Sequence, residues 1–397
     1  MPRGTARRLE PFGTSVFGEM SRLALEHSAV NLSQGFPDFD GPDLAKDAAI
    51  AAIRAGHGQY ARTTGIPDLH RALSEKFRRY WGLEFAPDSE ITVTSGATEA
   101  IFSTIQGLCE PGDEVILFEP YYDSYKASVV MAGAVPRIVT LRAPDWSFDP
   151  EELAATAASP RARAILLNSP HNPTGKVFSP EDMERIARIC KERDLVCITD
   201  EVYEHLVYEG THVPMAGLPG MRDRTVTISS FGKTFSLTGW KIGWAAAPPP
   251  LTAAVRAAHQ FVTFATATPL QHAAAATIAG APESFYAELL ASYRRRRDYL
   301  ARELAAIGFD VRPAAGTYFL CAGFRRFSAE DDITFAKSLV TGVGVAVVPP
   351  SSFYDHPEHG RDWVRFAFCK RMETLEAAVA RLRKLAPRAV AAGAAPA

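Results

Sequence analysis

Two lysines, Lys233 and Lys241, lie close together in one glycine-rich stretch that runs from Ser229 to Trp244. The stretch follows the apolar, β-branched run Thr225 to Ile228, which is typical of a strand. A lysine in a tight turn after a strand, among small hydroxylated residues, suits a phosphate or a carbonyl group as its partner. The alternative is a surface loop with two solvated lysines, because lysine side chains are mostly exposed. Residues elsewhere in the chain must decide between these interpretations.

Strand-like runs recur between helical segments along most of the chain, at residues 90–94, 114–118, 136–141, 164–168, 195–199, 225–229 and 243–247. Such continuous apolar strands, alternating with helices, predict an α/β fold with a mainly parallel sheet covered by helices on both faces. Ligands of these sheets bind beyond the carboxyl ends of the strands. The candidate site residues are therefore the polar residues that directly follow the strands.

The residues at these strand ends meet the chemical needs of pyridoxal phosphate. Its aldehyde needs a lysine, and its ring nitrogen needs a carboxylate. Its phosphate group needs hydroxyl groups, N–H groups and a cation as partners, and its ring needs an aromatic face. Lys233 is the candidate for the Schiff base with the aldehyde and for moving a proton between substrate and cofactor. Asp200, at the end of an apolar strand, is the candidate partner of the ring nitrogen. Its alternative role is a helix N-cap.

The phosphate and the ring have candidate partners of their own. Ser230 and Lys241 suit the phosphate, together with Ala97 and Thr98, where a strand and a small-residue turn open a helix and form an anion site. Three residues are candidates for the ring: Tyr122 for stacking, Asn172 and Tyr203 for hydrogen bonds to its hydroxyl group. Tyr122 could equally be a packing residue, and Asn172, which precedes a proline, could belong to a structural turn.

Substrate contacts are predicted at Gly35 and Arg365. Gly35 lacks a Cβ, so its backbone can approach a ligand closely, although a plain loop is the alternative. Arg365 begins a strand, and a guanidinium binds a carboxylate in bidentate fashion; an exposed salt bridge is its alternative role. Four aromatic residues suggest a pocket for apolar or aromatic side chains, or else core or dimer packing: Phe17, Tyr121, Phe264 and Tyr318.

The pattern divides the chain into two domains with a boundary near Ala281-Pro282. We expect residues 1–40, which show little periodicity, to form an N-terminal arm and part of the small domain. Residues 41–281 form the predicted large cofactor-binding domain, and residues 282–386 a smaller α+β domain. The run Arg294 to Arg297 is interpreted as a solvated helix face, and the alanine-rich residues 387–397 as a disordered tail.

Composition favours a soluble cytoplasmic protein without nucleic-acid or membrane partners. The chain has 397 residues, 47% of them hydrophobic, and a net charge of −2, which gives no reason to expect nucleic acid or an anionic membrane surface as a partner. It has no apolar run near the ~20 residues of a membrane span and no secretory signal. The five cysteines are interpreted as small core residues of a reducing compartment, and no spacing suggests a metal site.

Beyond these single residues, the chain resembles the class I/II aminotransferases, which are fold type I pyridoxal phosphate enzymes. The resemblance covers about residues 10–385 and is closest to the kynurenine/glutamine/methionine aminotransferase subgroup, which includes N-succinyldiaminopimelate aminotransferase-like proteins. The motifs that carry it are Ser230–Lys233 with Thr238–Gly243, Asn31–Pro42, Thr94–Ala100, Glu119–Tyr125, Ser169–Gly175, Asp200–His205, Gly316–Leu320 and Val364–Lys370. One departure is Pro350–Phe353, where many relatives have a glycine at the edge of the substrate pocket.

The resemblance implies a large domain with a mainly parallel seven-stranded sheet, and a homodimer whose active sites lie at the subunit interface. It supports each cofactor role given above and adds Tyr60, which the family would lend to the phosphate of the neighbouring subunit. Gly35, Asn172 and Arg365 correspond to the substrate contacts.

The reaction implied is ping-pong transamination between an L-amino acid and a 2-oxo acid, with Lys233 as the Schiff-base lysine and proton shuttle. The alternative on the same scaffold is a carbon–sulfur β-lyase of the cysteine-conjugate or cystathionine type. A pyridoxal phosphate-binding regulatory module fused to a DNA-binding domain is disfavoured, because only some ten residues precede the resemblance and no basic helix-turn-helix stretch is present.

Overall fold

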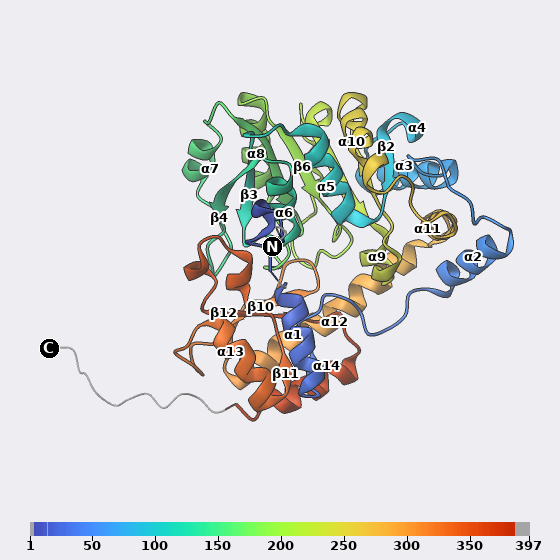
Figure 1. Ribbon diagram of the computed structural model, residues 1–397. Helices are drawn as coiled ribbons and strands as arrows, with labels where there is room; N and C mark the ends of the chain where they lie inside the picture. The colour runs from blue at the N-terminus through green and yellow to red at the C-terminus, as the bar shows by residue number, and fades with distance from the viewer. Residues whose placement is uncertain (1–3, 14, 386–397) are drawn as a thin grey trace.

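A seven-stranded sheet organises the upper part of the molecule in Figure 1, a computed structural model that describes residues 4–13 and 15–385. Its strands lie in the order β2-β8-β7-β6-β5-β3-β4. Strands β3 to β7 pair in parallel, whereas β8 is antiparallel to both neighbours. The predicted mainly parallel sheet is therefore confirmed. The strands are β2 Ile91–Thr94, β3 Glu114–Glu119, β4 Val135–Thr140, β5 Ala162–Asn168, β6 Val196–Asp200, β7 Thr225–Ser230 and β8 Gly243–Ala246.

The direction of β8 follows from the segment that joins it to β7. Parallel neighbours need a long crossover connection, usually a helix packed on the sheet. Residues 231–242 contain only the short helical turns α9 (Phe231–Thr234) and η4 (Thr238–Trp240), and the N–H of Phe231 donates to the carbonyl of Ile242 at 2.9 Å. The chain therefore turns back at once, and both lysines of this segment stay at the carboxyl edge of β7.

Helices cover both faces of this sheet because successive strand residues point to opposite sides. Leu117 of β3 packs into a core with α5 and α10, whereas its neighbour Phe118 packs into a second core with α7 and α8. Helix α11 packs against both α2 and α3, and α3 also contacts β2. The helices are α2 Asp43–Arg54, α3 Pro67–Trp81, α4 Pro87–Glu90, α5 Gly96–Leu108, α6 Ser124–Met131, α7 Pro150–Thr156, α8 Pro180–Glu192, α10 Pro249–Val262 and α11 Thr268–Gly280.

The lower part of the molecule in Figure 1, here called the small-sheet region, combines the C-terminal quarter of the chain with its N-terminal helix. The antiparallel sheet β12-β10-β9 and the parallel pair β1-β11 form its strands. Its elements are α1 Val16–Glu26, β1 Val30–Asn31, α12 Glu283–Ile307, β9 Asp310–Val311, β10 Phe319–Gly323, α13 Asp332–Ser338, β11 Val345–Ala346, β12 Trp363–Ala367 and α14 Met372–Leu382.

The N-terminal residues are more regular than predicted, because Val16–Glu26 forms a helix. The Ser15 hydroxyl caps this helix by accepting a hydrogen bond from the N–H of Gly18 at 3.2 Å. Met20 and Ala24, one helical turn apart, are buried in the core of the small-sheet region. The sequence carries both signals, but the helix is stabilised by residues more than 300 positions away, so the local pattern understated it.

The interpretation of Arg294 to Arg297 as a solvated face is wrong for Arg297. Arg294 and Arg295 are exposed, but Arg297 shares the buried stripe of α12 with Tyr293 and Leu300. Its guanidinium donates to the carbonyl of Ala314 at 2.9 Å and pairs with Glu209 at 2.9 Å. The helical period of 3.6 residues brings one arginine of the run onto the core side. The tail predicted at residues 387–397 lies outside the described residues.

All five cysteines are buried and free, as predicted for small core residues. None of the helices within residues 4–13 and 15–385 is long and apolar enough to cross a membrane. Within those same residues, histidine, cysteine, aspartate and glutamate form no group of three or more that could hold a metal ion.

A buried ion pair joins α3 to the loop after β6. Lys76 Nζ lies 2.5 Å from Glu204 Oε1, and both side chains are almost fully buried. The carboxylate also accepts hydrogen bonds from Trp81 Nε1 at 3.1 Å and from the Ser229 hydroxyl at 3.0 Å. Burial acts to raise the pKa of Glu204, but attraction from Lys76 and His205 outweighs it and lowers this pKa to about 2. The carboxylate therefore stays ionised in the folded protein.

We expect Lys76→Met to lower the free energy of unfolding by about 3–5 kcal/mol, because it leaves a buried charge without its counter-ion. The double variant Lys76→Met/Glu204→Gln is expected to recover most of this loss. The amide carries no charge, its oxygen can accept from Trp81, and its NH2 group can donate to the Ser229 hydroxyl. Urea unfolding of both variants measures the difference. Equal destabilisation of the single and the double variant would contradict this account.

Candidate active site

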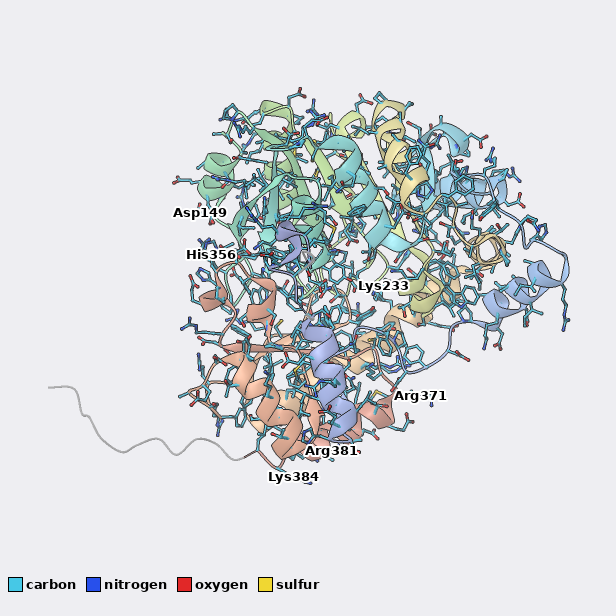
Figure 2. The ribbon with its side chains drawn as sticks, viewed as in Figure 1. Asp149, Lys233, His356, Arg371, Arg381 and Lys384 are labelled. Atoms are coloured by element: carbon cyan, nitrogen blue, oxygen red, sulfur yellow. The ribbon has the colours of Figure 1, made fainter. Side chains whose placement is uncertain are left out.

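A cavity of about 310 Å³ lies between the carboxyl edge of the seven-stranded sheet and the small-sheet region. In Figure 2, Lys233 lies in this zone between the two parts of the molecule. Every predicted site residue except Tyr60 lines the cavity. These residues are Gly35, Ala97, Thr98, Tyr122, Asn172, Asp200, Tyr203, Ser230, Lys233, Lys241 and Arg365. The residues that were selected by their position after strand ends therefore line one cavity.

Lys233 lies in the turn α9 directly after β7. Its ammonium lies 5.7 Å from the ring centroids of both Tyr203 and Tyr318. Burial lowers the pKa of Lys233 to about 8; Asp200 opposes this effect and Lys241 adds to it. An amine with this pKa is far more nucleophilic near neutral pH than an ordinary lysine, because more of it is unprotonated.

Asp200 ends β6 and is buried at the floor of the cavity. Its Oδ2 accepts a hydrogen bond from the Tyr125 hydroxyl at 2.6 Å, and Oδ1 accepts the N–H of Val202 at 3.3 Å. Burial raises the pKa of Asp200 to about 6, although the Tyr125 hydrogen bond acts to lower it. A buried carboxylate of this kind is stabilised by a cationic partner, and both Asp200 and Lys233 line the cavity.

Arg365 is fully buried, so the alternative of an exposed salt bridge is wrong. One terminal nitrogen donates to Asn172 Oδ1 at 2.9 Å and the other to the carbonyl of Ser33 at 2.8 Å. Its Nε has no hydrogen-bond partner within the described residues. The guanidinium lies 4.0 Å from the ring centroid of Phe319 and 5.2 Å from that of Phe17. Burial lowers the pKa of Arg365 to about 10, which leaves it charged at neutral pH.

Another part of the cavity lining, at the start of α5, has backbone features that suit an anion. The first turn of α5, at Gly96 to Thr98, has N–H groups without intrahelical acceptors, and the dipole of the helix points the same way. Lys241 adopts a left-handed backbone conformation with a φ of 54°. Gly243 packs so closely on this turn that a Cβ there would lie 2.5 Å from the carbonyl carbon of Gly96. The close approach of two backbones therefore shapes the anion site.

Tyr60 does not line this cavity. Its side chain is 83% exposed and packs edge-on against Phe264 at 5.2 Å between ring centroids. Of the four aromatic residues suggested for the substrate pocket, only Phe17 lines the cavity. The Tyr121 hydroxyl donates to Asp355 at 2.6 Å, and that of Tyr318 to the carbonyl of Gly35 at 2.7 Å. These two tyrosines are thus held by hydrogen bonds outside the cavity lining.

Sequence reasoning gave no role to two residues that position the predicted ones. Asn168 pairs with Asp200 in the register of β5 and β6, donates to its carbonyl at 2.7 Å, and accepts the N–H of Asn172 at 2.7 Å. Tyr125, in the first turn of α6 and three residues after Tyr122, donates its hydroxyl to Asp200. The sequence carried one signal for each residue: Asn168 is a polar residue at the last position of a buried strand, and Tyr125 forms a pair with a tyrosine three residues before it. His171, at another strand end, instead bonds Thr174 at 2.8 Å.

Known proteins match this chain along nearly its whole length. The sequence model of one protein family, Aminotransferase class I and II, matches residues 27–382. The chain belongs to this family.

The relatives of this aminotransferase include proteins with solved structures. The structure of N-succinyldiaminopimelate aminotransferase from Mycobacterium tuberculosis is 47% identical, covers 96% of this chain and 100% of that one, and superposes with a TM-score of 0.94. Methionine aminotransferase of Escherichia coli is 40% identical over 95% of this chain and 97% of its own length. Kynurenine–oxoglutarate transaminase 1 of Homo sapiens is 38% identical over 96% of this chain and 97% of its own length.

These matches confirm the predicted family, the fold type I architecture and the transfer of an amino group as the reaction, and they do not favour the carbon–sulfur lyase. Pyridoxal phosphate is the cofactor of this family. The cavity fits it, because a buried carboxylate, a lysine of lowered pKa and an anion site shaped by glycines all line the same space.

Proposed function

We propose that this aminotransferase moves the amino group of an L-amino acid to a 2-oxo acid in a ping-pong cycle at the cavity around Lys233. The observation that carries this proposal is that one cavity is lined by Lys233, Asp200 and Arg365 together. The cofactor, when bound, supplies the aldehyde that takes up the amino group and the ring that stabilises negative charge on the substrate.

At the cofactor, we assign a role to each end of the cavity. Lys233 Nζ carries the cofactor covalently and, once released, moves the proton at the Cα of the substrate. Asp200 faces the ring nitrogen, and its preference for a cationic partner supports this role. Tyr122 stacks on the ring, while Asn172 and Tyr203 bind its hydroxyl group. The remaining residues hold the phosphate: Ala97, Thr98, Ser230 and Lys241, joined by Tyr60 from a second copy of the chain.

At the substrate, Arg365 binds the carboxylate. Asn172 and the backbone at Gly35 are placed to assist it. Asn172 occupies one terminal nitrogen of the guanidinium and fixes its plane, while Nε remains available. A planar, pre-oriented guanidinium is suited to bidentate recognition of a carboxylate.

We also propose a cytoplasmic homodimer with active sites shared between subunits. Support comes from two aromatic side chains, three residues apart, that one copy leaves exposed: Phe261 is 87% exposed, and Phe264 packs on Tyr60 while remaining half-exposed. Exposed aromatic clusters of this kind mark protein interfaces. Residues 41–281 are proposed as the large domain, and residues 282–386, with part of the N-terminal arm, as the small domain.

An activity panel of amino donors and oxo acids tests the proposed function. Methionine, kynurenine and N-succinyldiaminopimelate, the substrates in the names of the relatives, are each offered with 2-oxoglutarate. We expect transfer of nitrogen to the oxo acid with at least one donor and no turnover without an acceptor. Release of pyruvate and ammonia from a cysteine conjugate in the absence of any oxo acid, with no transfer in the panel, would contradict it.

A further inference from the structure

Glu119 is a buried carboxylate at the end of β3 that no step of the proposed reaction uses, although it lies three residues before Tyr122 of the cavity. Four donors surround it. Its Oε1 accepts hydrogen bonds from the Thr140 hydroxyl at 2.8 Å and from His356 Nδ1 at 2.7 Å. Its Oε2 accepts the N–H groups of Asp355 at 2.7 Å and of His356 at 3.2 Å. Three of the four donors come from one short segment of the small-sheet region.

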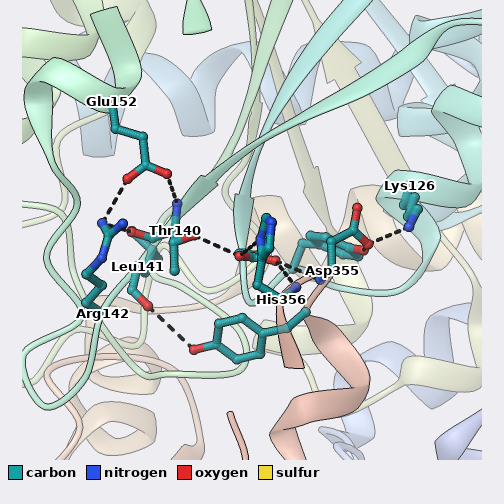
Figure 3. A network of polar contacts seen from close by, with 10 residues as sticks. Lys126, Thr140, Leu141, Arg142, Glu152, Asp355 and His356 are labelled. Carbon is teal, nitrogen blue, oxygen red and sulfur yellow. Dashed lines mark hydrogen bonds and ion pairs between the residues drawn. The ribbon is translucent and has the colours of Figure 1, made fainter. Parts of the chain in front are cut away.

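The same segment is bound a second time through Asp355. The Asp355 carboxylate accepts a hydrogen bond from the Tyr121 hydroxyl at 2.6 Å and pairs with the Lys126 ammonium of α6. The N–H of Tyr121 donates to the carbonyl of Phe353 at 2.9 Å. Figure 3 shows Lys126 pointing at Asp355, with His356 beside it. Residues 353–356 and the side chains of Glu119, Tyr121 and Lys126 together are here called the clamp.

The clamp lies next to the substrate end of the cavity. Phe353 ends the turn η6 (Pro350–Phe353) and is almost fully buried. Its ring centroid lies 5.5 Å from the Arg365 guanidinium and 5.6 Å from the ring of Phe17. Contacts between a cation and an aromatic face favour one orientation of the guanidinium. A segment tied to the edge of the large sheet therefore carries a ring that helps to orient Arg365.

We propose that Glu119 and His356 are positioning residues for the aminotransferase reaction, which hold residues 353–356 in place so that Phe353 keeps Arg365 aligned for the substrate carboxylate. This inference rests on the proposed function, because it takes Arg365 as the carboxylate-binding residue. Glu119 and His356 themselves lie outside the cavity lining, so they act through the segment between them.

The charge on His356 is part of this arrangement. The groups that face it are Glu119 from β3, Asp355 and Glu358 from its own segment, and the ring of His359 at 6.4 Å. Two residues further along the chain from Thr140, which donates to Glu119, the charge of Arg142 is paired with Glu152 at 2.8 Å. The hydrogen bond to Glu119 raises the pKa of His356. As the pH rises through that raised pKa, the imidazole of His356 loses its proton and is no longer attracted to the Glu119 carboxylate as a charge. The KM for the amino donor is therefore expected to increase on the alkaline side.

The test compares His356→Gln with the matched control His359→Gln. His356 is half-exposed, so its variant is expected to fold, and His359 makes no side-chain hydrogen bond within the described residues. For His356→Gln, we expect the KM of the amino donor to rise about fivefold while kcat changes by less than about twofold. The alkaline rise of KM should flatten in this variant, and cofactor content should remain that of the wild type. The control should match the wild type in each measurement.

A second variant, Glu119→Gln, and a second measurement, hydrogen exchange, test the same proposal independently of His356→Gln and of activity. Glu119→Gln removes the charge but keeps the size of the side chain, and it is expected to shift KM in the same direction. Hydrogen exchange of the amides of Asp355 and His356 is measured on the same proteins and needs no activity: it should be slow in the wild type and faster in both variants.

Unchanged KM in both variants, or fast exchange of these amides in the wild type, would overturn the clamp. A wild type with slow exchange but no amino transfer from any donor would instead contradict the proposed function.

Discussion

Replacing Lys233 by alanine is expected to abolish amino transfer, with a fall in kcat/KM of about 10⁴-fold or more, as found when a covalent catalytic group is removed. Lys233 lines the cavity, its amine lies 5.7 Å from the ring centroids of Tyr203 and Tyr318, and its lowered pKa suits covalent capture of an aldehyde. Steady-state kinetics on the best donor of the panel measures the loss. Reduction with borohydride, followed by mass spectrometry, shows whether the cofactor is attached at residue 233.

Lys241→Ala is the matched control, because this second lysine lies in the same connection between β7 and β8. We expect it to retain covalent attachment but to lose cofactor more readily on dialysis, since it removes the cation at the anion site. If the two variants behaved alike, the division of roles between the lysines would be wrong. A Lys233→Ala protein with near-normal turnover would contradict the assignment outright.

The same lysine sets a pH dependence for cofactor uptake. Capture of an aldehyde requires the unprotonated amine, and burial lowers the pKa of Lys233 from 10.5 to about 8. At pH 7 about a tenth of Lys233 is then unprotonated, against roughly 0.03% of an ordinary lysine. Capture by cofactor-free protein should accelerate as pH rises towards 8 and level off above it. Continued acceleration up to pH 10 would show that burial does not lower this pKa.

Replacing Arg365 by lysine is expected to raise the KM for the amino donor about 100-fold while cofactor content remains normal. Lysine keeps the charge but lacks the planar fork that matches a carboxylate, and truncating a buried, hydrogen-bonded charge costs about 2–5 kcal/mol in binding. The variant also leaves Asn172 Oδ1 or the carbonyl of Ser33 without its donor, since one ammonium cannot reproduce both contacts. Kinetics with varied donor, and absorbance of the bound cofactor, separate the two effects.

Arg361→Lys serves as the control for this experiment, because Arg361 is exposed in the same region of the chain. It should leave KM within about twofold of the wild type, as is usual for surface substitutions. If Arg365→Lys lost cofactor in proportion to activity, Arg365 would belong to the cofactor site rather than to the substrate site. An unchanged KM would remove it from the site altogether.

The sequence by itself determined the parts of the site that follow from strand ends. A parallel sheet brings the carboxyl ends of its strands to one edge, so Asn172, Asp200, Ser230 and Lys233 could be placed together from the pattern of apolar runs. The chemistry of these residue types then indicated pyridoxal phosphate. The seven strands themselves were predictable because strands covered by helices on both faces have few polar positions, whether they pair in parallel or, like β8, antiparallel.

Only the tertiary structure decided the environment of each group. Arg365 is fully buried and Arg297 faces the core, although local sequence favoured exposure for both, because burial depends on what packs against a strand or helix. Tyr125 became the partner of Asp200, and Glu119 the anchor of residues 355 and 356, through contacts across 75 and more than 230 positions. Long-range hydrogen bonds of this kind leave no periodic signal in the sequence, because the register between distant segments is set by packing of the whole fold.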